Sequence, residues 1–172
     1  MTRAELARRI FAVSHLTGQF RLRSGVTSKE YFDKYRFESD PAILRAIAEH
    51  MCPLVSTGVD ALAGLEMGGI PIATMLSQLT GLPVFFIRKK AKDYGTCRFA
   101  EGGDVKDRRL LLVEDVVTSG GAIIEAARAL RLDGAVISDV LCVIDRESGG
   151  TANLKKETLS LTALFKASEL KA

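Results

Sequence analysis

The sequence of 172 residues contains no tryptophan, only three cysteines and no long uninterrupted apolar run. Cys52, Cys97 and Cys142 are odd in number, far apart and without the spacing of a metal site, so disulfides and a bound zinc ion are both disfavoured. This use of cysteine indicates a reducing, cytoplasmic environment. A membrane-spanning helix needs about 18 consecutive apolar residues, and no segment supplies them, so we expect no membrane contact.

The sequence also lacks a large excess of charge of either sign, because 24 basic and 21 acidic residues give a formal net charge of only +3. A protein that binds nucleic acid usually has a larger basic excess arranged as a stripe. Here the basic residues concentrate between Arg88 and Arg98. This local concentration favours one anionic small-molecule ligand over a nucleic acid, although a solvated charged loop is the simpler alternative.

The length suits a single domain, residues 1–172, with one sizeable core. Short apolar runs alternate with apolar residues at helical spacing, and 47% of the residues are hydrophobic. This alternation is typical of an α/β protein. We expect strands at residues 59–63, 83–87, 110–113 and 135–144, helices at 1–13, 70–79 and 122–132 and from residue 40 onward, and then an edge strand at 155–161 and a closing helix at 164–170.

The most informative stretch is Arg109 to Ala122, where a buried strand, an acidic pair and a small-residue turn precede a helix. Main-chain N–H groups of a turn with the residues Thr118, Ser119, Gly120 and Gly121 can converge on an anion at the positive end of the helix. The preceding Glu114 and Asp115 would repel a bare polyphosphate, but they suit a ligand that also carries hydroxyl groups or a metal ion. A sugar phosphate satisfies both halves, whereas the lysine of nucleoside triphosphate loops and the dinucleotide glycine spacing are absent.

Three further segments contain candidate ligand-binding groups. A second glycine-rich turn, residues 64–69, could hold an anion through its main chain. Residues 88–103 combine a basic run with flanking glycines, as a mobile loop over an anion would. Arg146 follows a predicted strand, where its planar fork could bind a carboxylate through two hydrogen bonds; pairing with Asp145 or Glu147 at a surface turn is the alternative.

The amino-terminal region adds an arm, because two short alternating runs within residues 17–33 flank a glycine-containing turn. This pattern predicts a hairpin. Tyr31 and Phe32 lie near its end, where they could contact a planar ligand or simply pack beneath the arm.

These motifs together resemble the type I phosphoribosyltransferases. The stretch Val113–Gly121 is similar to the phosphoribosyl diphosphate signature of that family. The segments Phe20–Ser28, Arg88–Gly95 and Asp145–Gly150 resemble the hood, the catalytic loop and the base-binding end of its orotate-specific branch. Gly68, Tyr94 and Ser148 stand where that branch commonly has lysine, histidine and glutamate.

The resemblance implies a mainly parallel sheet flanked by helices on both faces, with a small N-terminal hood within residues 15–40. It also implies an Mg²⁺-dependent glycosyltransferase of pyrimidine biosynthesis that transfers ribose 5-phosphate from phosphoribosyl diphosphate (PRPP) to orotate, and a homodimer with a shared active site. Catalytic roles would fall to Lys92, Glu114 and Asp115, and the metal would be held mainly through the substrate, without a direct protein ligand. The PRPP-binding residues would be Arg88, Lys89, Lys92, Glu114, Asp115, Val116, Val117, Thr118, Ser119, Gly120, Gly121 and Ala122, and the orotate-binding residues Tyr31, Phe32, Thr118 and Arg146.

Two alternatives remain open from the sequence. One is a type I transferase for another base, such as a purine, which would offer no carboxylate to Arg146. The other is a non-catalytic relative that binds PRPP or a nucleotide as a regulator.

Overall fold

The computed structural model describes residues 1–21, 25–90 and 98–170. A six-stranded sheet forms its centre, in the order β5-β4-β3-β6-β7-β8, and all neighbouring strands are parallel except the β4–β5 pair. The strands of this sheet are β3 (Ala61–Leu65), β4 (Val84–Ile87), β5 (Ala100–Glu101), β6 (Arg109–Val117), β7 (Val136–Asp145) and β8 (Ser160–Lys166). The predicted α/β class with a mainly parallel sheet is confirmed.

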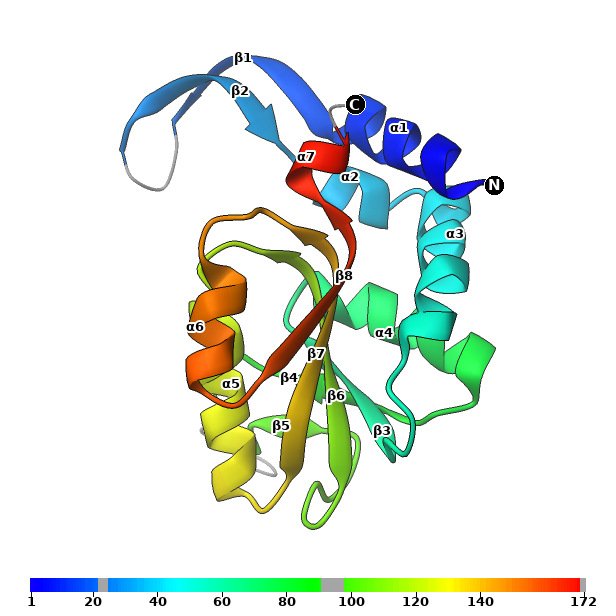
Figure 1. Ribbon diagram of the computed structural model, residues 1–172, viewed down its shortest axis with the longest axis vertical. Helices are drawn as coiled ribbons and strands as arrows, with labels where there is room; N and C mark the ends of the chain where they lie inside the picture. The colour runs from blue at the N-terminus through cyan, green and yellow to red at the C-terminus, as the bar shows by residue number, and fades with distance from the viewer. Residues whose placement is uncertain (22–24, 91–97, 171–172) are drawn as a thin grey trace.

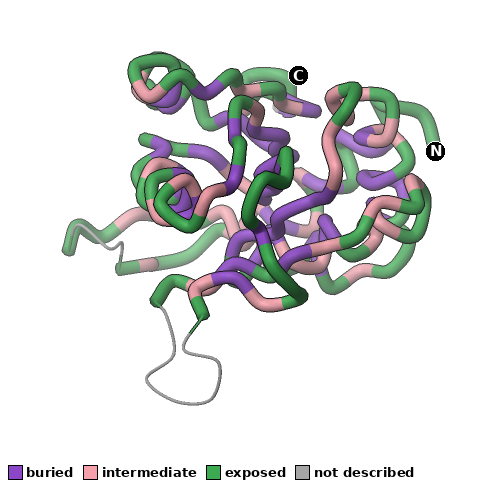
Figure 2. The backbone as a smooth tube through the Cα atoms, turned by 90° about the horizontal axis from the view of Figure 1, so that it is seen from below, coloured by how far each residue is buried: buried purple, intermediate pink, exposed green. Residues whose placement is uncertain are grey.

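Helices cover the sheet on both sides (Figure 1). The helices are α1 (Arg3–Ser14), α2 (Tyr35–Glu38), α3 (Pro41–Met51), α4 (Gly69–Thr80), α5 (Gly121–Leu132), α6 (Gly150–Lys156) and α7 (Ala167–Leu170), with a short 3₁₀ helix, η1 (Cys52–Leu54). One apolar core joins α1, α3 and α4 to the sheet, and a second core joins α5 and α6 to its other face. Figure 2 shows the buried backbone running through the middle of the molecule.

Strand β6 lies between β3 and β7 and contributes to both cores. Leu111 and Val113 pack on one face, whereas Leu110 and Leu112 pack on the other. Successive side chains of a strand point to opposite faces. A continuous apolar run is therefore what a strand covered on both sides requires.

The amino-terminal arm forms a separate antiparallel hairpin of β1 (His15–Arg21) and β2 (Thr27–Phe32). It projects beyond the body of the sheet in Figure 1. The predicted hairpin is confirmed, and we call it the hood. None of the described helices is long and apolar enough to cross a membrane.

The predicted edge strand and closing helix are both present, as β8 at the edge of the sheet and α7, but their predicted bounds were wrong. Helix α6 (Gly150–Lys156), which buries Leu154, was missed, and only residues 160–161 of the predicted range 155–161 belong to the edge strand β8. Residues 164–166 belong to strand β8, and the closing helix is limited to the short α7. Pairing with β7 from Asp139↔Ser160 to Asp145↔Lys166 outweighs the local helical pattern there.

Strand β6 is also longer than predicted. It was expected to end at Val113, but its pairing with β7 continues to Val117↔Asp145. The acidic pair therefore lies within the strand and not after it, and this position decides which way each carboxylate points.

Candidate functional site

The turn after β6 lies at the carboxyl edge of the sheet, as predicted. Gly120 has a φ of 81°, a conformation that disfavours residues with a side chain. An added Cβ there would also lie 3.1 Å from the Cγ atom of Leu154, so α6 supports the turn from behind. The Asn153 side chain donates a hydrogen bond of 3.0 Å to the carbonyl of Ser119. The fixed turn leaves the first amides of α5 available to an anion.

A cleft of about 750 Å³ opens above this turn. We call it the β6 cleft. Its lining includes Arg88, Lys89, Glu114 and the predicted phosphate-binding residues 116–122. The amide of Lys89 donates to the Glu66 carboxylate over 3.1 Å, which ties the start of the basic segment to the turn after β3. The structure thus brings together cationic side chains, a helix N-terminus and the carboxyl groups of Glu66, Glu114 and Glu125.

The two predicted carboxyl groups are hydrogen-bonded to each other but differ in their surroundings. Glu114 lines the cleft and is 9% exposed, whereas Asp115 is fully buried and points toward α2 and α4. Lys34 Nζ lies 2.6 Å from Asp115 Oδ2. The sequence analysis gave both carboxylates the same role at the ligand because it ended the strand before them.

Glu38 is a third carboxyl group near Asp115, and it is only 7% exposed. Burial and the charge of Asp115 raise the pKa of Glu38 to about 9. Burial also raises the pKa of Glu114 well above its usual range, and Asp115 adds to that rise. Burial acts in the same direction on Asp115, but hydrogen bonds with Glu114, Glu38 and Lys34 outweigh it and lower the pKa of Asp115.

The pKa of Lys34 is shifted by the same group of side chains. Burial lowers its pKa, but the hydrogen bond to Asp115 and the charge of Asp115 produce a net rise. At neutral pH, Asp115 and Lys34 are therefore the charged pair, and Glu38 holds a proton. Neither Lys34 nor Glu38 was predicted from the sequence, because isolated charged residues beside an apolar Phe37 resemble an ordinary exposed helix.

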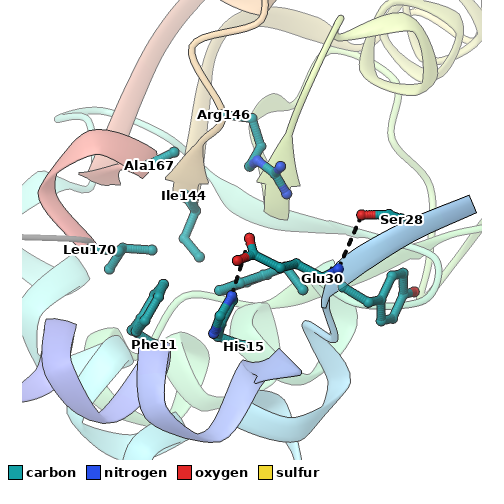
Figure 3. A pocket seen from close by; sticks show the side chains of 10 residues that line it. Phe11, His15, Ser28, Glu30, Ile144, Arg146, Ala167 and Leu170 are labelled. Atoms are coloured by element: carbon teal, nitrogen blue, oxygen red, sulfur yellow. Dashed lines mark hydrogen bonds and ion pairs between the residues drawn. The ribbon is translucent and has the colours of Figure 1, made fainter. Parts of the chain in front are cut away.

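A second pocket, of about 480 Å³, lies between the hood, α1 and the end of β7 (Figure 3). Tyr31, Phe32 and Arg146 line it, and Figure 3 shows Arg146 pointing into the space. The guanidinium carbon of Arg146 lies 6.0 Å from the ring centroid of Phe32, near the limit of a cation–π contact. We call this second pocket the hood pocket. His15 Nε2 and Glu30 Oε2 lie 3.4 Å apart and form another wall that the sequence analysis missed.

The two cavities adjoin at the ends of neighbouring strands. The amide of Arg146 donates to the carbonyl of Val117 over 2.8 Å. Of the residues predicted to contact the base, Thr118 lies in the β6 cleft and the other three lie in the hood pocket. Lys92 and Tyr94 lie outside the described residues, so their assignments stay predictions.

Comparisons with known proteins agree with this geometry. A family model described as "Phosphoribosyl transferase domain" matches residues 36–166. An orotate phosphoribosyltransferase of a Nocardioides species is 53% identical over 169 residues, which cover 98% of this chain and 94% of that protein. One from Methanocella arvoryzae is 40% identical over 153 residues, covering 89% and 87% of the two chains.

A solved structure gives the same result in three dimensions. The orotate phosphoribosyltransferase of Mycobacterium tuberculosis H37Rv, crystallised with 5-phospho-alpha-D-ribosyl 1-diphosphate, superposes with a TM-score of 0.84 and 26% identity. The match covers 99% of each chain.

The buried carboxyl group of Glu38 generates a prediction about pH. A carboxyl whose pKa is raised in the folded state stabilises the fold fully below its unfolded pKa, and that contribution is lost as the pH rises through the folded pKa. The folded value is about 9, against a usual 4.5. Glu38→Gln keeps the shape of the protonated acid without its titration, so between about pH 5 and about pH 9 the native chain should lose unfolding free energy relative to this variant.

Urea unfolding of both proteins across this range measures the difference. Glu49→Gln, at an exposed carboxyl of α3 that pairs with Arg45, is the matched control and should follow the native chain. Parallel curves for the native chain and Glu38→Gln would contradict a protonated Glu38.

Proposed function

Because the chain belongs to the phosphoribosyltransferase family, we propose that it transfers ribose 5-phosphate from PRPP to orotate, giving orotidine 5′-phosphate and diphosphate. The orotate phosphoribosyltransferases among its relatives support this reaction. The observation that carries the choice of base is the hood pocket, where Arg146 lies near an aromatic ring and next to the β6 cleft. An aromatic wall and a planar cationic fork suit a flat base that bears a carboxylate.

PRPP would occupy the β6 cleft with its 5′-phosphate at the turn of residues 116–122. The first amides of α5 and the hydroxyl groups of Thr118 and Ser119 are donors for that anion. Glu114 faces the same cleft and would accept hydrogen bonds from the ribose hydroxyls. Arg88 and Lys89 line the cleft as well and would hold the diphosphate, together with Lys92.

Orotate would lie in the hood pocket and reach the ribose at the junction between the two cavities. Arg146 would bind its carboxylate, and Tyr31 and Phe32 would pack against its ring. Thr118 lies in the cleft, from which it could contact the base only near the junction.

The reaction breaks the bond between ribose C1 and the diphosphate oxygen and forms a bond from C1 to a ring nitrogen of orotate. Positive charge develops on the ribose, and negative charge leaves with the diphosphate. The chain's own groups therefore act mainly by orientation and electrostatics: cationic side chains stabilise the leaving anion, and Glu114 holds the ribose. Closure of the site would exclude water.

Magnesium would neutralise part of the diphosphate charge when bound. Mg²⁺ keeps several waters and commonly binds through substrate phosphates. The described residues contain no group of three or more His, Cys, Asp or Glu side chains that could hold a metal. We propose that the ion enters with the substrate and has no direct protein ligand. The cytoplasmic location stays a prediction.

The assignment of orotate leads to a test at Arg146. Arg146→Ala should weaken the use of orotate by roughly 2–5 kcal/mol in kcat/KM, because the charge pair that orotate would form and desolvate in the pocket loses one partner. The KM for PRPP should change much less. Arg146→Lys should recover only part of the loss, since an ammonium group lacks the planar fork.

Steady-state kinetics with each substrate varied in turn would measure these values. Arg45→Ala on α3 is the control, because Arg45 is exposed and pairs only within its own helix among the described contacts. Native orotate kinetics in Arg146→Ala would remove the main support for a pyrimidine base.

We also propose a homodimer in which Lys92 of one subunit serves the site of the other. Lys92→Ala and Asp115→Asn should each be inactive alone. When their subunits exchange, each mixed dimer has one site with both lesions and one with neither, so about half of the sites in mixed dimers should be active. Activity of the mixture measures this recovery; no recovery after demonstrated exchange would place Lys92 at the site of its own subunit.

A further inference from the structure

The buried face of β6 contains a cluster that phosphoribosyl transfer does not by itself explain. Lys34, Glu38 and Asp115 form it, and we call it the anchor cluster. Asp115 is fully buried, and the Lys34 side chain is 33% exposed. An ionised carboxylate without solvent is stable only with a cationic or hydrogen-bonding partner. Lys34 supplies the positive charge at 2.6 Å.

The main chain of Gly68 closes the cluster from the side of α4. A Cβ added to Gly68 would lie 1.6 Å from Asp115 Oδ2 and 2.8 Å from Glu38 Oε1. The carboxylate therefore fills the space that any side chain at position 68 would need. Helix α4 begins at Gly69, and its positive end favours a negative charge there.

Hydrogen bonds connect this cluster to the β6 cleft. Asp115 Oδ1 accepts from the amide of Val116 over 2.5 Å. The amide of Asp115 in turn donates to Glu114 Oε1 over 3.0 Å. A hydrogen bond between the two side chains joins Asp115 to Glu114 directly, so fixing the Asp115 side chain fixes the orientation of the Glu114 carboxyl group.

We infer that Lys34 is a positioning residue: its ammonium group holds Asp115, and Asp115 holds Glu114 in the orientation that the ribose needs. This inference rests on the proposed function, because it takes Glu114 as the group that contacts the ribose. In this arrangement the adjacent carboxylates have different tasks. Glu114 faces the substrate, and Asp115 is an internal anchor.

The position of Lys34 in the chain extends the inference to the hood. Lys34 follows strand β2 by two residues, and Phe32 at the end of that strand lines the hood pocket. The amide of Asp33 donates to the carbonyl of Ser14 over 2.9 Å, which fixes the base of the hood to the end of α1. The ion pair therefore joins the segment that holds the base to the strand that holds the ribose.

The test replaces Lys34 with Met, which keeps the length but removes the charge. Lys34→Met should lower kcat/KM for PRPP at least about tenfold, and Lys34→Arg should recover most of it. Because Lys34 lowers the pKa of Asp115, its removal should move the acid limb of the pH profile of kcat/KM to higher pH. Lys29→Met, at an exposed lysine of the hood, is the matched control and should match the native profile.

A double-mutant cycle shows whether Lys34 acts through Asp115. In the Asp115→Asn background, Lys34→Met should change the affinity for PRPP, measured by calorimetry, by less than about twofold. If Lys34→Met had as large an effect in that background as it has in the native chain, the inference would be overturned. A lower melting temperature with native kinetics and a native acid limb would overturn it too, since that is a purely structural role.

Two further measurements keep the outcomes distinguishable. If Lys34→Met does not fold, Lys34→Gln takes its place and should show the same shift of the acid limb; an unmoved limb would overturn the inference. If the native chain transfers ribose phosphate to no base, the proposed reaction fails, and calorimetric binding of PRPP decides about Lys34. Affinity at least about tenfold weaker in Lys34→Met would support the inference, and native affinity would overturn it.

Discussion

Glu114 and Asp115 are consecutive residues of β6 whose side chains are hydrogen-bonded to each other, so the orientation of one constrains the other. One carboxylate can face a substrate only if the other is accommodated in the protein interior. The chain meets this need with Lys34, the main chain of Gly68 and a protonated Glu38. The geometry of the substrate face thus depends on an ion pair behind the strand.

The free energy of unfolding that would be lost by breaking this ion pair is large compared with the stability of one domain. Removing one partner of a buried ion pair typically costs about 3–5 kcal/mol, whereas whole domains are stable by roughly 5–15 kcal/mol. Replacing the pair with apolar residues often costs nothing, so stability alone gives little reason for it. A role in orienting the neighbouring carboxylate gives a functional reason for this arrangement.

Much of the fold was readable from the sequence, because β6 and α5 have strong apolar patterns and the hood is an alternating hairpin. The turn at 116–122, Arg88, Lys89 and Arg146 line the predicted kinds of cavity. The end of the chain was misread because pairing of β8 with β7 overrides local preference. The anchor cluster could not be predicted, since it depends on a contact between Lys34 and Asp115 that are far apart in sequence, and the roles of the site residues stay predictions.

The most direct measurement is a competition assay with the purified chain. PRPP and Mg²⁺ would be supplied with equal concentrations of orotate, uracil, adenine and hypoxanthine, and the consumption of each base would be followed by chromatography. The account predicts that orotate alone is consumed and that diphosphate appears in equal amount, because only orotate offers a carboxylate to Arg146. Preferential consumption of a purine, or no release of diphosphate with any base, would contradict it.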